Sequence, residues 1–277
     1  MCIRDSNSIS NNNCSNNDAG IHLSYSDNNR ISNNNMCDMF LGTSNNNTIS
    51  NNNGTIAIHF KSSSNNKLMN NVMVEGGIII EGCVLSHYIH DIDESNMING
   101  KPVHYLKNVE GGKVPDGAGQ IILANCTKVV IENQNLNDVC IGIEVAFSSN
   151  ITIKNNYCTN DTYGVILMYS NNNTMANNTA NSNNRYGIRL WHSSNNKIYL
   201  NNFINNTDNV YSRDSTNIWN STSPILYTYN GKTHTNYLGN YWDDYTGSDV
   251  DGDGIGDTYY PVDSDNDNYP LMKPFEN

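Results

Sequence analysis

Apolar residues recur along this chain at fixed offsets from short runs of asparagine. The segment Ile-Ser-Asn-Asn-Asn occupies residues 9–13, 31–35 and 49–53. Similar segments later in the chain are anchored by Ile153, Met175 and Ile198. Successive anchors within each half of the chain lie 18 to 23 residues apart. A period in this range is the signature of a solenoid, in which each repeat forms one coil.

Within each repeat, serine lies five residues before the anchor, and apolar residues lie eight and ten residues before it. These apolar pairs are Ile21 and Leu23, Met39 and Leu41, Ile58 and Phe60, Ile143 and Val145, Val165 and Leu167, and Ile188 and Leu190. Residues two apart share one face of a β-strand. We therefore predict an all-β solenoid of short strands, with these columns pointing inward and stacking from coil to coil.

Asparagine accounts for about one residue in five. It tolerates left-handed backbone angles better than other non-glycine residues. Equivalent asparagines in successive coils can also form a hydrogen-bonded ladder along the solenoid. We therefore expect the asparagines to lie at the corners between strands and to have an architectural role.

The repeat divides the chain into five segments. Residues 1–6 fit no repeat and are expected to be a non-native prefix, and residues 7–83 are expected to be coils whose start is truncated. Residues 84–118 interrupt the period and contain Pro102 and Pro115, so they are expected to form an insertion or side hairpin. Coils are expected again over 119–210. Residues 211–277 are expected to cap the solenoid, because its end would otherwise expose core and strand edges.

Charge and composition narrow the classes of partner. The net charge is −12 and the isoelectric point is about 4.8. A basic stripe typical of nucleic-acid binding is missing from the sequence, as is an apolar run of about twenty residues that would span a membrane. The seven cysteines have no close spacing, which favours single thiols over disulfides. The acidic C-terminal region suits an extracellular or cell-surface protein, with the periplasm as a further possibility.

The strongest local motif is Asp-Val-Asp-Gly-Asp-Gly-Ile-Gly-Asp at 249–257. Its spacing matches the first nine positions of a calcium loop. The expected ligands are the carboxylates of Asp249, Asp251, Asp253 and Asp257 and the carbonyl of Ile255. Tyr260 stands where an EF-hand has its bidentate glutamate, so a shorter calcium loop with a structural role is expected. Asp263, Asp265 and Asp267 are candidates for the missing ligands, and the alternative is a solvated acidic loop without an ion.

Several segments resemble one known family. They are His90–Asn108, Ala118–Leu136, the Gly-Ile coils and Gly239–Tyr260. Together they resemble the β-helix domain of the family described as periplasmic copper-binding protein NosD, within the pectin-lyase-like superfamily. The resemblance implies a right-handed, single-stranded parallel β-helix. It also suggests copper handling, for which His87, His90 and Met97 are the candidate ligands. Surface or hydrogen-bonded histidines are the alternative.

Similar β-helices include polysaccharide lyases, hydrolases and epimerases. Glycoside hydrolysis needs two carboxyl groups facing one bond. The outward position between the two inward columns is occupied in successive repeats by His22, Phe40, His59, Glu144, Ile166 and Arg189. Neighbouring coils do not present two carboxylates there, which argues against catalysis.

A binding role has better support in the sequence. The next outward position carries Trp191, with Arg189 and His192 beside it and Tyr169 and Tyr186 near it. Aromatic faces suit sugar rings, whereas the alternative is that Trp191 packs under a loop. The leading hypothesis is a non-catalytic β-helix protein that binds a polysaccharide or surface glycan, or serves as a structural surface module. A polysaccharide lyase or hydrolase and a copper-handling accessory protein are the alternatives.

Overall fold

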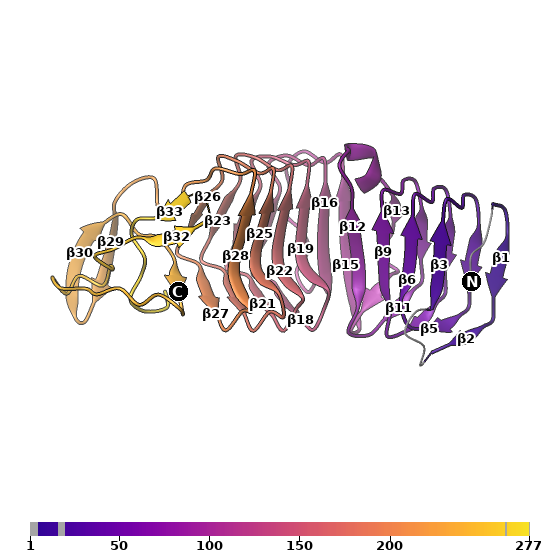
Figure 1. Cartoon of the computed structure of the whole chain (residues 1–277), viewed down its shortest axis with the longest axis horizontal. Coiled ribbons are helices and arrows are strands. Elements are labelled where there is room, and N and C mark those ends of the chain that lie inside the picture. The colour runs from indigo at the N-terminus through magenta and orange to yellow at the C-terminus, as the bar shows by residue number, and fades with distance from the viewer. Residues whose placement is uncertain (1–4, 16–19, 264, 277) are drawn as a thin grey trace.

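The computed structural model describes residues 5–15, 20–263 and 265–276. The chain is a right-handed parallel β-helix of about nine coils (Figure 1). The helix found among the described residues is a single 3-10 turn, η1 (Leu85–Tyr88). The predicted all-β solenoid is therefore confirmed. Residues 1–4 of the expected prefix lie outside the described residues, while Ser6 donates its backbone N–H to the carbonyl of Asp27 on the first coil.

The first stack of coils covers residues 8–98 and contains three parallel sheets. One sheet consists of β1 (Ser8–Ser10), β4 (Arg30–Ser32), β7 (Thr48–Ser50), β10 (Lys67–Met69) and β13 (Asp91–Ile92). The next begins with β2 (Asn13–Cys14), β5 (Asn35–Met36), β8 (Asn53–Gly54), β11 (Val72–Met73) and β14 (Met97–Ile98), and it continues into the second stack as one sheet of eleven strands. The third consists of β3 (Ile21–Ser24), β6 (Met39–Gly42), β9 (Ala57–Lys61) and β12 (Gly77–Glu81).

The second stack covers residues 101–213 and repeats this arrangement. Its main sheet consists of β15 (Lys101–Lys107), β16 (Gln120–Ala124), β19 (Ile141–Ala146), β22 (Tyr163–Met168), β25 (Tyr186–Trp191) and β28 (Asp208–Arg213). A second sheet consists of β17 (Val130–Glu132), β20 (Thr152–Lys154), β23 (Thr174–Ala176) and β26 (Lys197–Tyr199). A third consists of β18 (Asn135–Asn137), β21 (Tyr157–Thr159), β24 (Thr179–Asn181), β27 (Asn202–Ile204) and β31 (Tyr241–Trp242).

The segment 84–118 differs from the projecting insertion expected from its broken period. Strands β13 and β14 belong to the first stack, where they pair with β10 and β11. The chain then reverses at Asn99 and Gly100, because β15 pairs antiparallel with β14 and parallel with β16. The irregular spacing therefore marks the passage from one stack to the next. Residues 108–118 run beside the new stack through isolated bridges such as Glu110 to Thr127.

Two asparagine roles explain the repeat. Asn33 and Asn51 adopt left-handed angles with φ of 55° and 54°, which lets the chain turn between strands. The next asparagine in each run is buried and points along the solenoid. Asn34 donates its Nδ2 to Oδ1 of Asn52 at 3.0 Å, and Asn52 donates to Asn71 at 2.9 Å. The expected corners and ladders are both confirmed, and the inward apolar columns are buried as expected.

The two stacks are offset from each other. As a result, outward-facing residues at the start of the second stack cover the end of the first stack. Strand β12 is the last strand of its sheet, so one edge lacks a neighbouring strand. Gln120 fills that position with two hydrogen bonds to the backbone of Ile78, at 2.9 and 2.7 Å. Glu144 accepts the backbone N–H of Ile80 at 3.4 Å. Glu144 and Ile166, expected on an exposed outward face, are consequently buried.

The C-terminal segment, residues 214–276, lies at the far end of the second stack (Figure 1). It contains two hairpins, β29 (Ile225–Tyr229) with β30 (Lys232–Asn236) and β32 (Tyr260–Val262) with β33 (Asp265–Asp267). Trp242 stacks on Phe203 of the last coil at 4.5 Å between ring centroids. Asn240 extends the asparagine ladder by accepting a hydrogen bond from Asn201 at 2.9 Å.

Two further expectations concern cysteines and membrane spans. All six described cysteines are free, as expected, although Cys83 is exposed while Cys126 and Cys158 are buried. Within residues 5–15, 20–263 and 265–276, the model contains no helix whose length and apolar character would let it cross a membrane.

Candidate functional site

The outward side of β22, β25 and β28 carries a continuous group of aromatic and cationic side chains, which we call the aromatic face. Parallel pairing in register places equivalent residues of successive strands side by side. Tyr163 and Tyr186 are such a pair, with ring centroids 5.9 Å apart. Tyr211 is in register with Arg189, and its ring reaches back to stack on Tyr186 at 5.1 Å, which completes a row of three tyrosines. Trp191 lies at the other end of β25 and remains half-buried. The stacking of coils thus converts a sequence period into an extended surface.

Three arginines lie over these rings. The guanidinium carbon of Arg189 is 5.8 Å from the ring centroid of Tyr163 and 5.7 Å from that of Trp191. Arg213 lies 4.8 Å above the Trp191 ring. Arg185 lies 5.4 Å above Tyr186. Cation–π attraction at such distances holds the guanidinium groups against the face.

A second aromatic row occupies the corner that follows β19, β22 and β25. Phe147, Tyr169 and His192 stack in sequence, at 4.7 and 5.1 Å between centroids. All three have left-handed backbone angles, with φ near 50°. Trp191 contacts His192 edge to face at 5.5 Å. The five residues proposed from the sequence as a sugar-binding group therefore lie on one surface, although Tyr169 and Tyr186 belong to different rows.

Sequence reasoning missed four members of the aromatic face. They are Tyr163, Arg185, Tyr211 and Arg213. Tyr211 stands opposite Arg189, and Arg213 stands opposite Trp191, in the strand that follows. Tyr211 and Arg213 could have been found from the sequence, because extending the same outward columns by one repeat reaches both of them. The repeat weakens beyond Val210, which is why the last strand was left out.

A narrow cleft lies where the aromatic face meets the first stack. Its lining includes Glu81, Glu144 and Arg189, and its volume is about 10 Å³, roughly the space of one water. Burial raises the pKa of Glu144 well above its usual range. The hydrogen bond from His59 lowers the pKa of Glu81. Two carboxyl groups therefore do share a site, contrary to the expectation from the sequence. That expectation compared neighbouring coils, whereas Glu81 and Glu144 come from different stacks.

The Glu144 carboxyl in this cleft is not accessible to a substrate. Glu144 is 1% exposed and its carboxyl oxygen is bonded to the backbone of Ile80. The cleft volume is far below the several hundred Å³ of an ordinary ligand pocket. The Glu144 carboxyl therefore completes the edge of β12.

The histidines proposed for copper do not form a ligand set in this fold. His90 is buried, and burial lowers its pKa to about 4. One ring nitrogen accepts the backbone N–H of Asn66 at 3.2 Å, and the other lies 3.0 Å from the carbonyl of His87. Since both nitrogens are occupied, His90 has none left for a metal. His87 lies in the 3-10 turn η1 and not in a strand.

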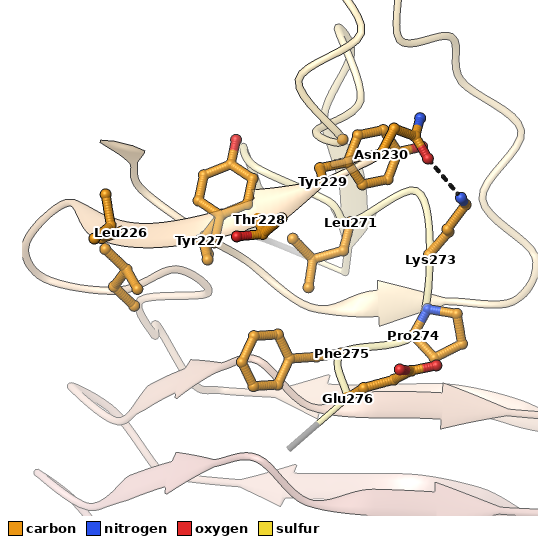
Figure 2. A pocket seen from close by; sticks show the side chains of 13 residues that line it. Leu226, Tyr227, Thr228, Tyr229, Asn230, Leu271, Lys273, Pro274, Phe275 and Glu276 are labelled. Atoms are coloured by element: carbon orange, nitrogen blue, oxygen red, sulfur yellow. Dashed lines mark hydrogen bonds between the residues drawn. The ribbon is translucent and has the colours of Figure 1, made fainter. Parts of the chain in front are cut away.

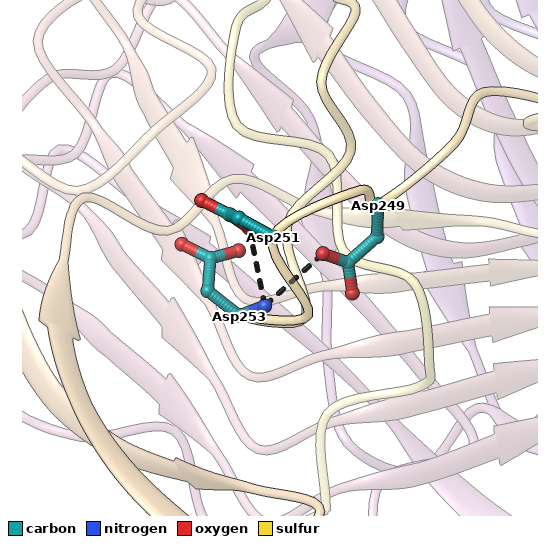
Figure 3. A group of neighbouring side chains, drawn as sticks. All are labelled: Asp249, Asp251 and Asp253. Atoms are coloured by element: carbon teal, nitrogen blue, oxygen red, sulfur yellow. Dashed lines mark hydrogen bonds between the residues drawn. The ribbon is translucent and has the colours of Figure 1, made fainter.

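The 249–257 loop brings three carboxylates together (Figure 3). Oxygen atoms of Asp249, Asp251 and Asp253 all lie within 4.8 Å of one another. Among the described residues, this is the one group of three or more histidine, cysteine or acidic side chains close enough to hold an ion. Asp249 also accepts backbone N–H groups from Gly252 and Gly254. Such oxygen ligands suit a hard cation and not copper.

The remaining aspartates near this loop have other partners. Asp257 accepts the backbone N–H of Val250 at 2.8 Å and lies outside the three-carboxylate group. Asp263 and Asp265 accept backbone N–H groups of Ser212 and Asn217. Asp267 is fully buried and accepts the Trp242 indole N–H at 3.0 Å. Of these three aspartates, expected as further ligands, Asp263 attaches the C-terminal segment to β28 of the second stack, whereas Asp265 and Asp267 accept hydrogen bonds from within the C-terminal segment.

A larger pocket of about 750 Å³ lies in the C-terminal segment, between β29 and residues 271–276 (Figure 2). Its aromatic walls are already engaged. Tyr229 is covered by Lys273, whose Nζ lies 4.9 Å above the ring and also donates to Asn230. The Tyr227 ring stacks on His234, and its hydroxyl donates to the carbonyl of Asp253. Both tyrosine rings of this pocket are therefore already covered or stacked by side chains of the C-terminal segment.

Comparison with known proteins identifies one family. The profile of a family described as "Periplasmic copper-binding protein (NosD)" matches residues 89–197 and 117–247. No curated protein sequence matches the chain. Among solved structures, the chain is similar to the A-module of the mannuronan C-5 epimerase AlgE6 of Azotobacter vinelandii, at 13% identity and a TM-score of 0.29. The match covers 72% of this chain and 63% of that module.

Proposed function

The chain belongs to the NosD family of β-helix proteins, and on that premise we propose that it is a non-catalytic module that binds a polysaccharide along the aromatic face. The observation that carries the proposal is the half-exposed Trp191, flanked by the guanidinium groups of Arg189 and Arg213. The tyrosine row continues this surface across three coils. Rings with polar edges and planar donors in a repeating row suit a repeating sugar chain.

The non-catalytic part of the proposal is supported by the state of the acids. Glu144 is sealed against β12, and Glu81 is paired with His59 at 3.2 Å. Neither carboxyl is arranged to protonate a leaving group or activate water on an opposite face of a sugar.

We also propose that the 249–257 loop binds calcium and braces the C-terminal segment, and that the protein works in the periplasm or outside the cell. Tyr227 and Asn236 of the β29–β30 hairpin bond to Asp253 of the loop, at 2.9 and 3.3 Å. An ion that fixes the loop would therefore also fix the hairpin. Copper handling has the family's description as its support, and the histidine arrangement speaks against it here.

The test is co-sedimentation with a panel of insoluble polysaccharides in calcium, with protein and soluble sugar both measured in the supernatant. We expect depletion of the protein without release of sugar. Trp191→Ala should abolish the depletion, while the matched variant Tyr157→Ala should not. Tyr157 is 53% exposed on β21, in a different sheet. Sugar release would establish catalysis, and failure to bind any polysaccharide would reject the carbohydrate proposal.

A further inference from the structure

We infer that the aromatic face selects saccharides that carry anionic groups, carboxylate or sulfate, and that Arg189 with Arg185 makes the selection. This inference rests on the proposed function and names its ligand class. It follows from two observations. One is which ring surfaces are not covered by other side chains, and the other is which guanidinium N–H groups have no acceptor in the protein.

The flat faces of the rings are largely occupied. Tyr186 and Tyr211 stack on each other with an interplanar angle of 28°. Arg213 covers Trp191, and Arg185 covers Tyr186. Rings that stack along the solenoid turn their edges to the solvent. The face therefore offers a neutral sugar ring little flat surface to lie on, and recognition must depend on its hydrogen-bonding groups.

The guanidinium groups are the strongest of these hydrogen-bonding groups. Each carries five N–H donors. Arg185 donates one of them to the Tyr163 hydroxyl at 2.6 Å. Within the described part of the chain, Arg189 has no ion pair or hydrogen-bond acceptor, although it is half-buried between two rings. A planar guanidinium with free donors binds carboxylate and sulfate oxygens in pairs, which a neutral hydroxyl cannot match.

The charge around the face supports the same assignment. The chain as a whole carries a net charge of −12, so a general affinity for polyanions is not expected. Arg213 lies 3.6 Å from Asp214, which also lies 3.7 Å from His192. Arg213 is therefore partly neutralised. Among the described residues neither Arg185 nor Arg189 forms a salt bridge, although Arg189 shares the cleft with Glu81 and its charge helps to lower the pKa of that carboxyl. Arg185 and Arg189 carry the positive charge that an anionic ligand would meet.

The tryptophans provide a direct readout. Trp219 and Trp242 are each 1% exposed, whereas Trp191 is half-buried on the face. Saccharide binding here should therefore be visible as a change in the fluorescence of Trp191. Dextran oligosaccharides in unmodified, carboxymethylated and sulfated forms provide probes with one backbone. The two charged forms separate a carboxylate ligand from a sulfate ligand.

We expect a charged form to bind at least about tenfold more tightly than the neutral form. Arg189→Gln, and separately Arg185→Gln, should remove about tenfold of the affinity for the charged form and leave the neutral form unchanged. Lys197→Gln and Lys232→Gln remove the same charge from exposed sites on other sheets and should change neither affinity. Circular dichroism checks that each variant is folded.

The outcomes separate the two claims. If neutral and charged forms bind equally, or if the arginine variants lose no affinity for the charged form, the anionic selection is wrong while carbohydrate binding stands. If the lysine variants weaken binding as much as the arginine variants do, the attraction is general and the assigned site is wrong. If no saccharide from this set or the co-sedimentation panel binds, both claims fail.

Discussion

The carboxyl group of Glu144 accepts a hydrogen bond from the backbone N–H of Ile80, 64 residues earlier and on the other stack of coils. Ile80 lies on β12, the last strand of its sheet. An exposed strand edge invites pairing with other chains. Here a side chain from the second stack satisfies the edge, and burial raises the pKa of the carboxyl well above its usual range, which favours the protonated form.

Glu144→Gln is expected to fold at least as stably as the parent protein at neutral pH, because the amide keeps an acceptor for Ile80 and carries no buried proton that the unfolded chain would lose. Glu144→Ala should lower the free energy of unfolding by about 2 kcal/mol, since it leaves a buried N–H without a partner. Urea denaturation measures both values. Hydrogen exchange of the Ile80 amide should accelerate in the alanine variant alone. Equal stability of the two variants would show that the bond contributes nothing.

The same bond predicts a dependence on pH. A raised pKa means that the folded protein holds its proton more tightly than the unfolded chain does. Glu144 therefore makes its full contribution to the free energy of unfolding below its ordinary pKa of 4.5. That contribution is lost as the pH rises from 4.5 toward the pKa of the carboxyl in the folded protein. Glu144→Gln carries no such proton, so its advantage over the parent protein should grow from pH 5 to alkaline pH. A constant difference between the two would contradict the buried, protonated state.

Asp161 lies in a column that continues with the asparagines Asn183 and Asn206. Its backbone N–H donates to Asn183, and its Oδ1 accepts from Val139 at 3.0 Å, but Oδ2 is buried without a partner. Burial raises its pKa from 3.8 to about 8, so stability falls as the pH rises between these values. Asp161→Asn should raise the free energy of unfolding at pH 8 by about 1 kcal/mol. It should also flatten the pH profile measured by thermal unfolding.

The two kinds of asparagine should respond differently to substitution. Asn52→Ala removes the acceptor for the buried Asn34 backbone N–H, which lies 3.1 Å away. The expected loss of stability is about 3 kcal/mol. Asn51→Gly is the control, because Asn51 is exposed and its φ of 54° suits glycine. Denaturant titration measures the free energy of unfolding of both variants. Equal stability of the two would contradict the role of the ladder.

The calcium proposal predicts stabilisation that depends on Asp251. Calcium at a hundred times its dissociation constant should stabilise the protein by about 2.7 kcal/mol. Thermal unfolding with calcium and with a chelator measures the shift. Asp251→Asn keeps the loop's shape and should abolish most of the effect, whereas Asp116→Asn, in a different exposed loop, should retain it. An equal shift in both variants would place the ion elsewhere.

Much of the fold could be predicted from the sequence because the β-helix is a local repeat. Ile58 and Phe60 are buried where their spacing places them, and Asn34 and Asn52 form the expected ladder. Arg189 and Trp191 share a face because alternation along a strand fixes which side a residue faces. These properties depend on neighbouring coils, which the period already specifies.

What the sequence could not show depends on how the stacks meet. Glu144 is outward on its own sheet, as its position indicates, yet it is buried because the first stack ends against it. No period relates Glu144 to Ile80. The partners of His90 and Asp267 were missed for the same reason, since a turn and a terminal segment place them. The aromatic face was incomplete because its last strand lies where the repeat fades.

The reversal at Asn99 and Gly100 divides the protein into two stacks of coils that meet at a single joint. Gln120 and Glu144 are specific to the joint, whereas the coils away from it are joined by the same asparagine and serine contacts again and again. Whole coils could therefore be duplicated or deleted in either stack without altering the joint. The length of the solenoid on each side of the joint becomes a quantity that evolution, or a protein engineer, can set independently in steps of a single coil.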